Sequence, residues 1–188
     1  MPAGAGARRG DALRDHAAAG LAMPKYSAGV LLHRSVDGAV VEVLIGHPGG
    51  PFWARKDDGA WSIPKGEYDP DTDDPWSAAQ REFAEELGCD VPVGPRIEFD
   101  AVKQPSGKVL TVFAVDADLD VTEAQSNTFA LEWPKGSGRI QEFPELDRVG
   151  WFPVAQARRK LLNGHVVFLD RLMTHLPGLG EGDPDPAG

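Results

Sequence analysis

Residues 66–88 read GEYDPDTDDPWSAAQREFAEELG and decide the fold of this chain. The second half of this stretch places Glu82, Glu85 and Glu86 at i, i+3 and i+4, so all three side chains project from one face of a helix. Carboxylates at this spacing repel one another, and one arginine, Arg81, cannot neutralise three of them. Hard oxygen donors gathered in this way indicate a site for Mg²⁺ or Mn²⁺. For such a cluster seen in isolation, a solvated acidic helix face is the alternative.

The residues before this cluster predict a strand followed by a turn. Residues 61–64 favour a short strand, and residues 65–67 favour a turn in which Gly66 permits unusual backbone angles and close approach of a ligand. A loop with Pro70 and several aspartates follows and leads to the helix.

The helix itself has recognisable ends. Its N-cap is expected at Asp73 or Asp74, with Pro75 in the first turn, and it is expected to run to Leu87 and stop at Gly88. A carboxylate side and an apolar side therefore lie on one helix. The apolar side is formed by Ala78, Ala79, Phe83 and Leu87.

This unit resembles the box of the Nudix hydrolase superfamily, G-x5-E-x7-R-E-U-x-E-E-x-G-U, where U is apolar. Residues 81–89 fit the second half at every specified position. In the first half Asp73 stands where the family has glutamate, and six residues rather than five separate it from Gly66, an insertion that a loop accepts cheaply. The resemblance covers roughly residues 25–176 and implies an α/β fold, a Nudix-type α/β/α sandwich with a mixed β-sheet.

Enzymes with this box generally cleave a nucleoside diphosphate linked to another moiety, X, by attack of water on phosphorus. The resemblance implies that Glu82, Glu85 and Glu86 bind Mg²⁺ (or Mn²⁺) together with the backbone carbonyl of Gly66, and that Glu85 and Glu86 are catalytic. Arg81 is expected to orient the glutamates or anchor the loop rather than touch substrate.

The general base of several members lies outside the helix, on a loop near the strand that ends the core. Residues 144–147 (Pro-Glu-Leu-Asp), ahead of Trp151, look like the stretch that supplies an extra metal-binding or basic glutamate in dinucleoside-polyphosphate and RNA-pyrophosphate hydrolases. Glu145 is therefore expected to be catalytic and metal-binding, ahead of Glu142. A surface glutamate is the alternative for each.

Three basic residues are candidates for substrate binding. The run Pro64-Lys65-Gly66 resembles diadenosine and inositol polyphosphate hydrolases, in which the equivalent lysine meets phosphate, so Lys65 is expected to contact phosphate rather than solvent alone. Arg55 and Lys56, on a Gly/Pro-containing loop, are weaker candidates.

Beyond the box, the pattern of apolar residues predicts strands interrupted by one helix and closed by helices, which indicates an α/β layered domain. The strands are expected at residues 26–33, 40–45, 96–103, 109–115, 129–133 and 149–152, and the later helices at 154–162 and 166–176.

Length and composition limit the organisation and the partners. With 188 residues and 41% hydrophobic content, one domain is expected at 24–177, between disordered tails at 1–23 and 178–188. The net charge of −10 argues against extended nucleic-acid binding and against an anionic membrane, but it allows a small nucleoside polyphosphate bound with cations. No apolar run is long enough to span a membrane.

One cysteine, Cys89, cannot form an internal disulfide, which is typical of a reducing compartment, and residues 1–23 lack the apolar core of a signal peptide. A cytoplasmic protein is therefore predicted. A homodimer stays open, because dimers are common in the superfamily and no segment decides the matter.

The leading interpretation is a divalent-metal-dependent pyrophosphohydrolase of a nucleoside polyphosphate, with dinucleoside polyphosphates slightly preferred. One alternative is a pyrophosphatase that sanitises nucleoside triphosphates. Another is a non-catalytic nucleotide-sensing module, although such members typically lose box glutamates and this chain keeps all three.

Overall fold

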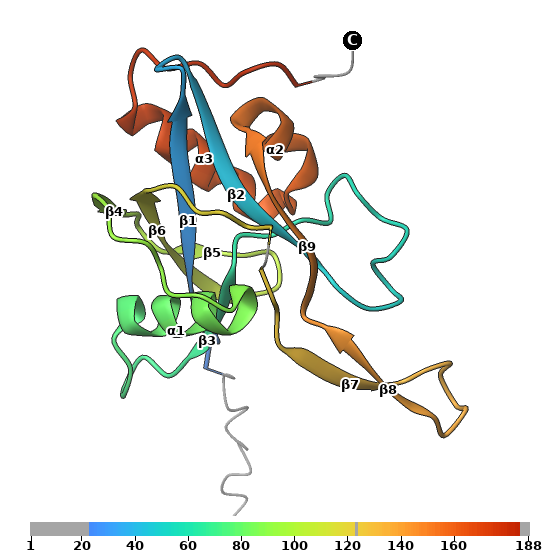
Figure 1. Cartoon of the computed structure of the whole chain (residues 1–188). Helices are drawn as coiled ribbons and strands as arrows, with labels where there is room; N and C mark the ends of the chain where they lie inside the picture. Colours follow the sequence, from blue (N-terminus) through green and yellow to red (C-terminus); the bar gives the residue numbers. More distant parts are fainter. Residues whose placement is uncertain (1–22, 123, 185–188) are drawn as a thin grey trace, which may run out of the picture.

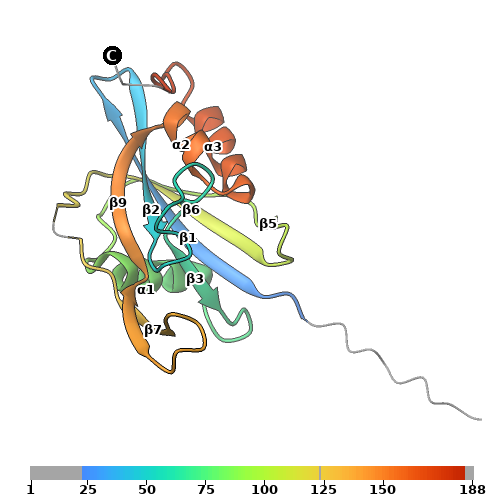
Figure 2. The ribbon, with the colours of Figure 1, turned by 90° about the vertical axis from the view of Figure 1, so that its right-hand side faces the viewer.

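The structure is a computed structural model that describes residues 23–122 and 124–184. One mixed sheet lies between α1 on one face and α2 and α3 on the other, and a two-stranded hairpin projects from the body (Figures 1 and 2). The predicted α/β/α arrangement is confirmed. The elements are β1 Tyr26–Val36, β2 Val40–Pro48, β3 Lys65–Tyr68, α1 Pro75–Leu87, β4 Arg96–Glu98, β5 Val102–Lys103, β6 Val109–Asp116, β7 Thr128–Glu132, β8 Ile140–Pro144, β9 Leu146–Pro153, α2 Val154–Lys160 and α3 Asn163–His175.

The central strand of the sheet is β1. It runs parallel to β6 on one side and antiparallel to both β2 and β3 on the other, and β9 pairs with β2 at the far edge. β3 occupies the first half of β1, where Gly66 faces Ala28, and β2 occupies the second half, where Val43 faces His33. β3 and β2 therefore lie along the same side of β1, one after the other, and the chain that joins them forms a loop.

The sheet buries a separate core on each face. Side chains alternate along β1, so Val30 and Leu32 pack under α1 whereas Leu31 packs under α2 and α3. The four predicted apolar residues of α1 are all buried, which confirms the helix face assigned from the sequence. No helix within the described ranges is long and apolar enough to cross a membrane.

Local predictions differ from the structure in several places. The predicted turn at 65–67 is wrong, since these residues form β3 and are paired with β1. The expected strand at 61–64 is reduced to single bridges, Ser62 with Gly46 and Trp61 with Leu161. The strand expected at 96–103 is divided into β4 and β5, and β8 was not predicted at all.

The end of the described chain lies against the sheet. Composition predicts a disordered tail from residue 178, yet Val41 N–H donates to the carbonyl of Gly180 at 2.9 Å, and Arg158 forms two hydrogen bonds with the carboxylate of Glu181 at 2.8 and 2.7 Å. The predicted N-terminal tail, apart from Met23, and residues 185–188 lie outside the described residues.

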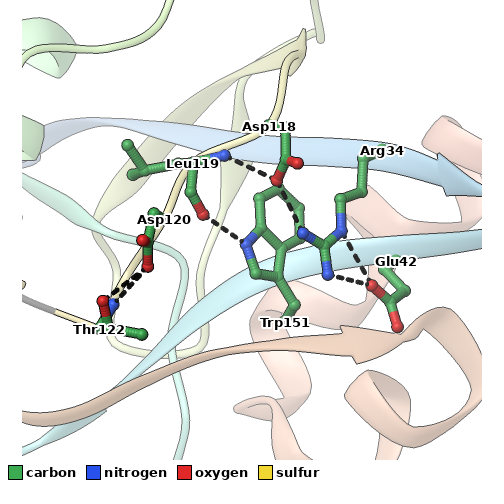
Figure 3. Close-up of polar contacts among 7 residues, drawn as sticks. All are labelled: Arg34, Glu42, Asp118, Leu119, Asp120, Thr122 and Trp151. Carbon is green, nitrogen blue, oxygen red and sulfur yellow. Dashed lines mark hydrogen bonds and ion pairs between the residues drawn. The ribbon is translucent and has the colours of Figure 1, made fainter.

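An arginine-centred network fixes the segment that follows β6 (Figure 3). Arg34 of β1 donates to Glu42 of β2 at 2.9 and 2.7 Å and to Asp118 at 2.7 Å, and its guanidinium lies 4.3 Å from the ring centre of Trp151. The indole N–H of Trp151 donates to the carbonyl of Leu119 at 2.9 Å. This segment leads on to residues 125–127, which lie beside the site described next.

Candidate active site

Helix α1 is placed by a side-chain cap at its start and a left-handed residue at its end. Asp74 accepts hydrogen bonds from the backbone N–H of Ser77 at 2.9 Å and from its hydroxyl at 3.0 Å, which identifies Asp74 as the N-cap. Gly88 ends the helix with φ 75°. Asp73 instead lies 3.8 Å from Arg81 as an ion pair.

Glycine at position 66 is required by space rather than by backbone angle. A Cβ added to Gly66 would lie 1.8 Å from Oε2 of Glu82, so any larger residue displaces this carboxylate. The φ of Gly66 is not positive, in contrast to the unusual angles expected from the sequence. The group that approaches Gly66 closely is the carboxylate of Glu82, and this contact joins the first half of the box to the helix. The close approach of a ligand stays a prediction.

Glu86 reaches the same strand. Its Oε2 accepts a hydrogen bond from the backbone N–H of Lys65 at 3.3 Å. Burial raises the pKa of Glu86 to about 8, although the Lys65 ammonium and this hydrogen bond act in the opposite direction, and Glu145 and Glu82 raise it further. Burial also lowers the pKa of Lys65, and the nearby Glu86 partly offsets this effect. Lys65 forms no ion pair within 4.0 Å among the described residues.

Glu145 joins the glutamates of α1 from a distant part of the chain. The pKa of Glu82 is raised first by burial, then by the charge of Glu85 and, less strongly, by that of Glu145. Glu145 lies between β8 and β9, where its N–H donates to the carbonyl of Asn127 at 2.8 Å and its carbonyl accepts from Gly49 at 2.9 Å. The N–H of Asn127 donates in turn to the carbonyl of Glu85 at 3.1 Å. Asn127 thus bridges the helix and Glu145.

The other predicted residues comprise three that make no hydrogen bond or ion pair with these carboxylates within the described ranges, and Arg81, which does. Glu142 is exposed on β8, opposite Ala130 in the projecting hairpin. Arg55 and Lys56 are exposed, and Lys56 lies over the Trp53 ring at 4.7 Å. Within the described ranges, neither forms a hydrogen bond or ion pair with the glutamates. Arg81 has the expected geometry, because it contacts Asp73 and also Glu82, at 3.3 Å.

One residue that sequence reasoning missed is His47, which anchors the loop carrying Arg55 and Lys56. It is fully buried, with Nδ1 2.7 Å from Asp147 Oδ1 and Nε2 2.8 Å from the carbonyl oxygen of Lys56. It therefore fastens this loop to the strand that follows Glu145. A lone histidine in an apolar strand carries no signal of such a role, since its partner Asp147 lies 100 residues away in the sequence.

The donor set fits a hard divalent cation that keeps some of its own water. The pKa values of Glu82 and Glu86 are raised, because neighbouring protein cations do not offset the effects of burial and of mutual repulsion. Among the described residues, no three His, Cys, Asp or Glu side chains converge on a ready-made metal cage. Mg²⁺ commonly binds through one or two carboxylates, several waters and substrate phosphates, and so needs no such cage.

The family comparison and the comparison with solved structures agree with each other. The profile of the family described as NUDIX domain matches residues 23–172. Among curated proteins no sequence matches. Among solved structures, the NUDIX domain of Shewanella oneidensis NrtR complexed with ADP ribose is 17% identical, with TM-score 0.55 over 81% of this chain and 88% of that chain.

Two further solved structures show the same fold. A C. elegans Ap4A hydrolase binary complex is 19% identical, with TM-score 0.53 over 81% of this chain and 99% of that one. A Nudix hydrolase from M. smegmatis, RenU, is 21% identical, with TM-score 0.52 over 80% and 84%. At these identities the likeness concerns the fold.

Proposed function

Because this chain belongs to the Nudix family, we propose that it is a divalent-metal-dependent pyrophosphohydrolase that cleaves a phosphoanhydride bond of a nucleoside polyphosphate. The observation that carries the proposal is that the charges of Glu85 and of Glu145, from the β8–β9 junction, act on Glu82 of α1, and those of Glu82 and Glu145 act on Glu86, beside Gly66 and Lys65. A site that has four carboxylates and few protein cations attracts positive ions strongly.

Glu82, Glu85, Glu86 and the carbonyl of Gly66 would hold Mg²⁺ or Mn²⁺, with Glu145 as a further ligand. A bound divalent cation supplies charge neutralisation of the phosphoryl oxygens and helps orient the attacking water. This fits the chemistry, since phosphoryl transfer depends mainly on positioning and on stabilising negative charge.

The chain itself would supply the proton acceptor and the orientation of the site. Glu145 is the proposed acceptor of the proton from the attacking water, because it is exposed to solvent and carries backbone restraints on both sides. Glu85 and Glu86 hold the metal-facing side of the site. Arg81 acts by fixing Glu82 and Asp73 rather than by touching substrate.

The proposed substrate is a dinucleoside polyphosphate. Lys65, next to Gly66, has no ion pair with another described residue, so its ammonium can bind the phosphate chain. This agrees with the likeness of Pro64-Lys65-Gly66 to polyphosphate hydrolases. The solved relatives named above include an Ap4A hydrolase and a domain bound to ADP ribose. Arg55 and Lys56 would contact substrate only after movement of their loop.

A substrate panel tests this function. Diadenosine tetraphosphate and nucleoside triphosphates are incubated with the protein in Mg²⁺ and in Mn²⁺, and the products are separated by chromatography. ATP plus AMP from the dinucleotide supports the proposal. Monophosphate plus pyrophosphate from a triphosphate supports the sanitising pyrophosphatase instead. Tight nucleotide binding without any turnover supports a sensing module.

A further inference from the structure

A second feature is a cavity of about 400 Å³ on the α3 side of the sheet, between β1, the β5–β6 connection and the start of α3. None of its lining residues is acidic, although the chain has a net charge of −10. Two lysines, five further polar residues and an apolar wall line it. The residues that matter here are Lys65, Gln104, Lys108, Leu110, Leu162 and His165.

His165 presents a hydrogen-bond donor to this cavity. Its side chain is almost completely buried, with 3% exposure, and its Nδ1 accepts a hydrogen bond from the backbone N–H of Ile63 at 3.2 Å. Nδ1 therefore carries no proton, so the proton of the neutral ring lies on Nε2. Burial lowers the pKa of His165 to about 3, and the neighbouring Lys65 charge adds to this, so the ring stays neutral. In the described part of the chain Nε2 has no partner.

Two more donors lie on the same wall. The side-chain Nε2 of Gln104 is buried without a hydrogen-bond partner among the described residues. Helix α3 begins without a side-chain cap, so the backbone N–H groups of Asn163 and Gly164 at its first turn are not capped by a side chain. A cavity lined with unpaired donors, lysines and a helix N-terminus favours a negatively charged, acceptor-rich group.

We propose that this cavity binds a phosphoryl group carried by the organic moiety X, at a distance from the bond that is cleaved. The phosphoryl oxygens accept from His165 and the first turn of α3, and from the side-chain amide of Gln104 once it turns toward the cavity. Lys65 supplies charge, together with Lys108 once it exchanges its ion pair with Glu67, at 2.5 Å, for the phosphoryl group. Leu110 and Leu162 pack against the carbon skeleton that bears the phosphate. The inference rests on the proposed function, because Lys65 borders both this cavity and Glu86 and so links the two sites on one substrate.

Binding is tested in EDTA, which removes the metal site from the measurement. The ¹⁵N-labelled full-length protein is titrated with AMP, with inorganic pyrophosphate and with adenosine, and amide shifts are followed by NMR. AMP and pyrophosphate are expected to shift the amides of Gln104, Gly164 and His165, and adenosine is expected to bind at least tenfold more weakly. Equal binding of adenosine and AMP would overturn the proposal, as would an absence of shifts at these three amides.

Gln104→Glu is the decisive variant, because it keeps the shape of the side chain and places a carboxylate among the donors. It is expected to weaken AMP binding at least tenfold, whereas the same change at exposed Gln80 on α1 has no effect. Unchanged AMP binding in Gln104→Glu contradicts the proposal. If Gln104→Glu unfolds, Lys108→Gln replaces it and is expected to weaken AMP severalfold. Metal-dependent hydrolysis by a protein that fails these tests leaves the proposed function standing.

Discussion

The backbone N–H of Lys65 donates to Oε2 of Glu86 at 3.3 Å, so the edge strand β3 and helix α1 meet through one carboxylate. Glu82 lies against Gly66 on the same strand. The two halves of the sequence box are thus held together by direct contact. Disturbance of either half is expected to change the position of the glutamates before it changes the fold.

Gly66→Ala tests the contact with Glu82. The added methyl group would lie 1.8 Å from Oε2 of Glu82, and the flexible carboxylate moves away at small cost to stability. Turnover is expected to fall about tenfold to a hundredfold, while the unfolding temperature falls by only a few degrees. Steady-state kinetics and thermal unfolding measure both. Wild-type turnover in a folded Gly66→Ala protein would show that the position of Glu82 is unimportant.

The pKa of Glu86 predicts a pH dependence of stability in EDTA. Below pH 4.5, the pKa of Glu86 in the unfolded state, this carboxyl is protonated in both the folded and the unfolded protein. As the pH rises toward about 8, the carboxyl ionises first in the unfolded protein. Glu86 therefore lowers the free energy of unfolding progressively between these two pH values. The upper limit of the loss is about 5 kcal/mol. His165 acts in the opposite direction between pH 6.5 and about 3. The difference between wild type and Glu86→Gln isolates Glu86, and thermal melts at pH 5 to 8.5 should show it growing with pH. A constant difference would contradict the prediction.

Arg81→Ala separates a positioning role from substrate contact. Both ion pairs of Arg81 are partly exposed, so the loss of stability is expected to be below about 1 kcal/mol. Glu82 then loses its neighbouring charge, and kcat is expected to fall about tenfold with KM nearly unchanged. A large rise in KM at constant kcat would mean that Arg81 binds substrate.

Glu145 and Glu142 give a matched pair for the proton acceptor. Glu145→Gln is expected to lower kcat and kcat/KM by about a hundredfold or more. Glu142→Gln, on the exposed hairpin strand, is expected to leave both unchanged. The assignment fails if the two variants behave alike, or if only Glu142→Gln loses activity.

The sequence predicted the parts that depend on local pattern. The apolar face of α1, its stop at Gly88 and most strands follow from periodicity and capping chemistry. The contacts of Glu145 with Asn127 and Gly49 could not be predicted, because they join residues distant in sequence. The assignment of 65–67 to a turn failed for a similar reason, since an edge strand is defined by its partner β1. His47 and the cavity at His165 gave no local signal at all.

The most direct test of the account is calorimetric titration of the pure, folded protein with Mg²⁺ and with Mn²⁺, in the presence and absence of nucleotide. The account predicts saturable uptake that is tightened by nucleotide and strongly weakened in both Glu85→Gln and Glu86→Gln, each of which keeps its fold and loses turnover by orders of magnitude. An absence of uptake under all of these conditions, or near-normal turnover in both variants, would contradict it.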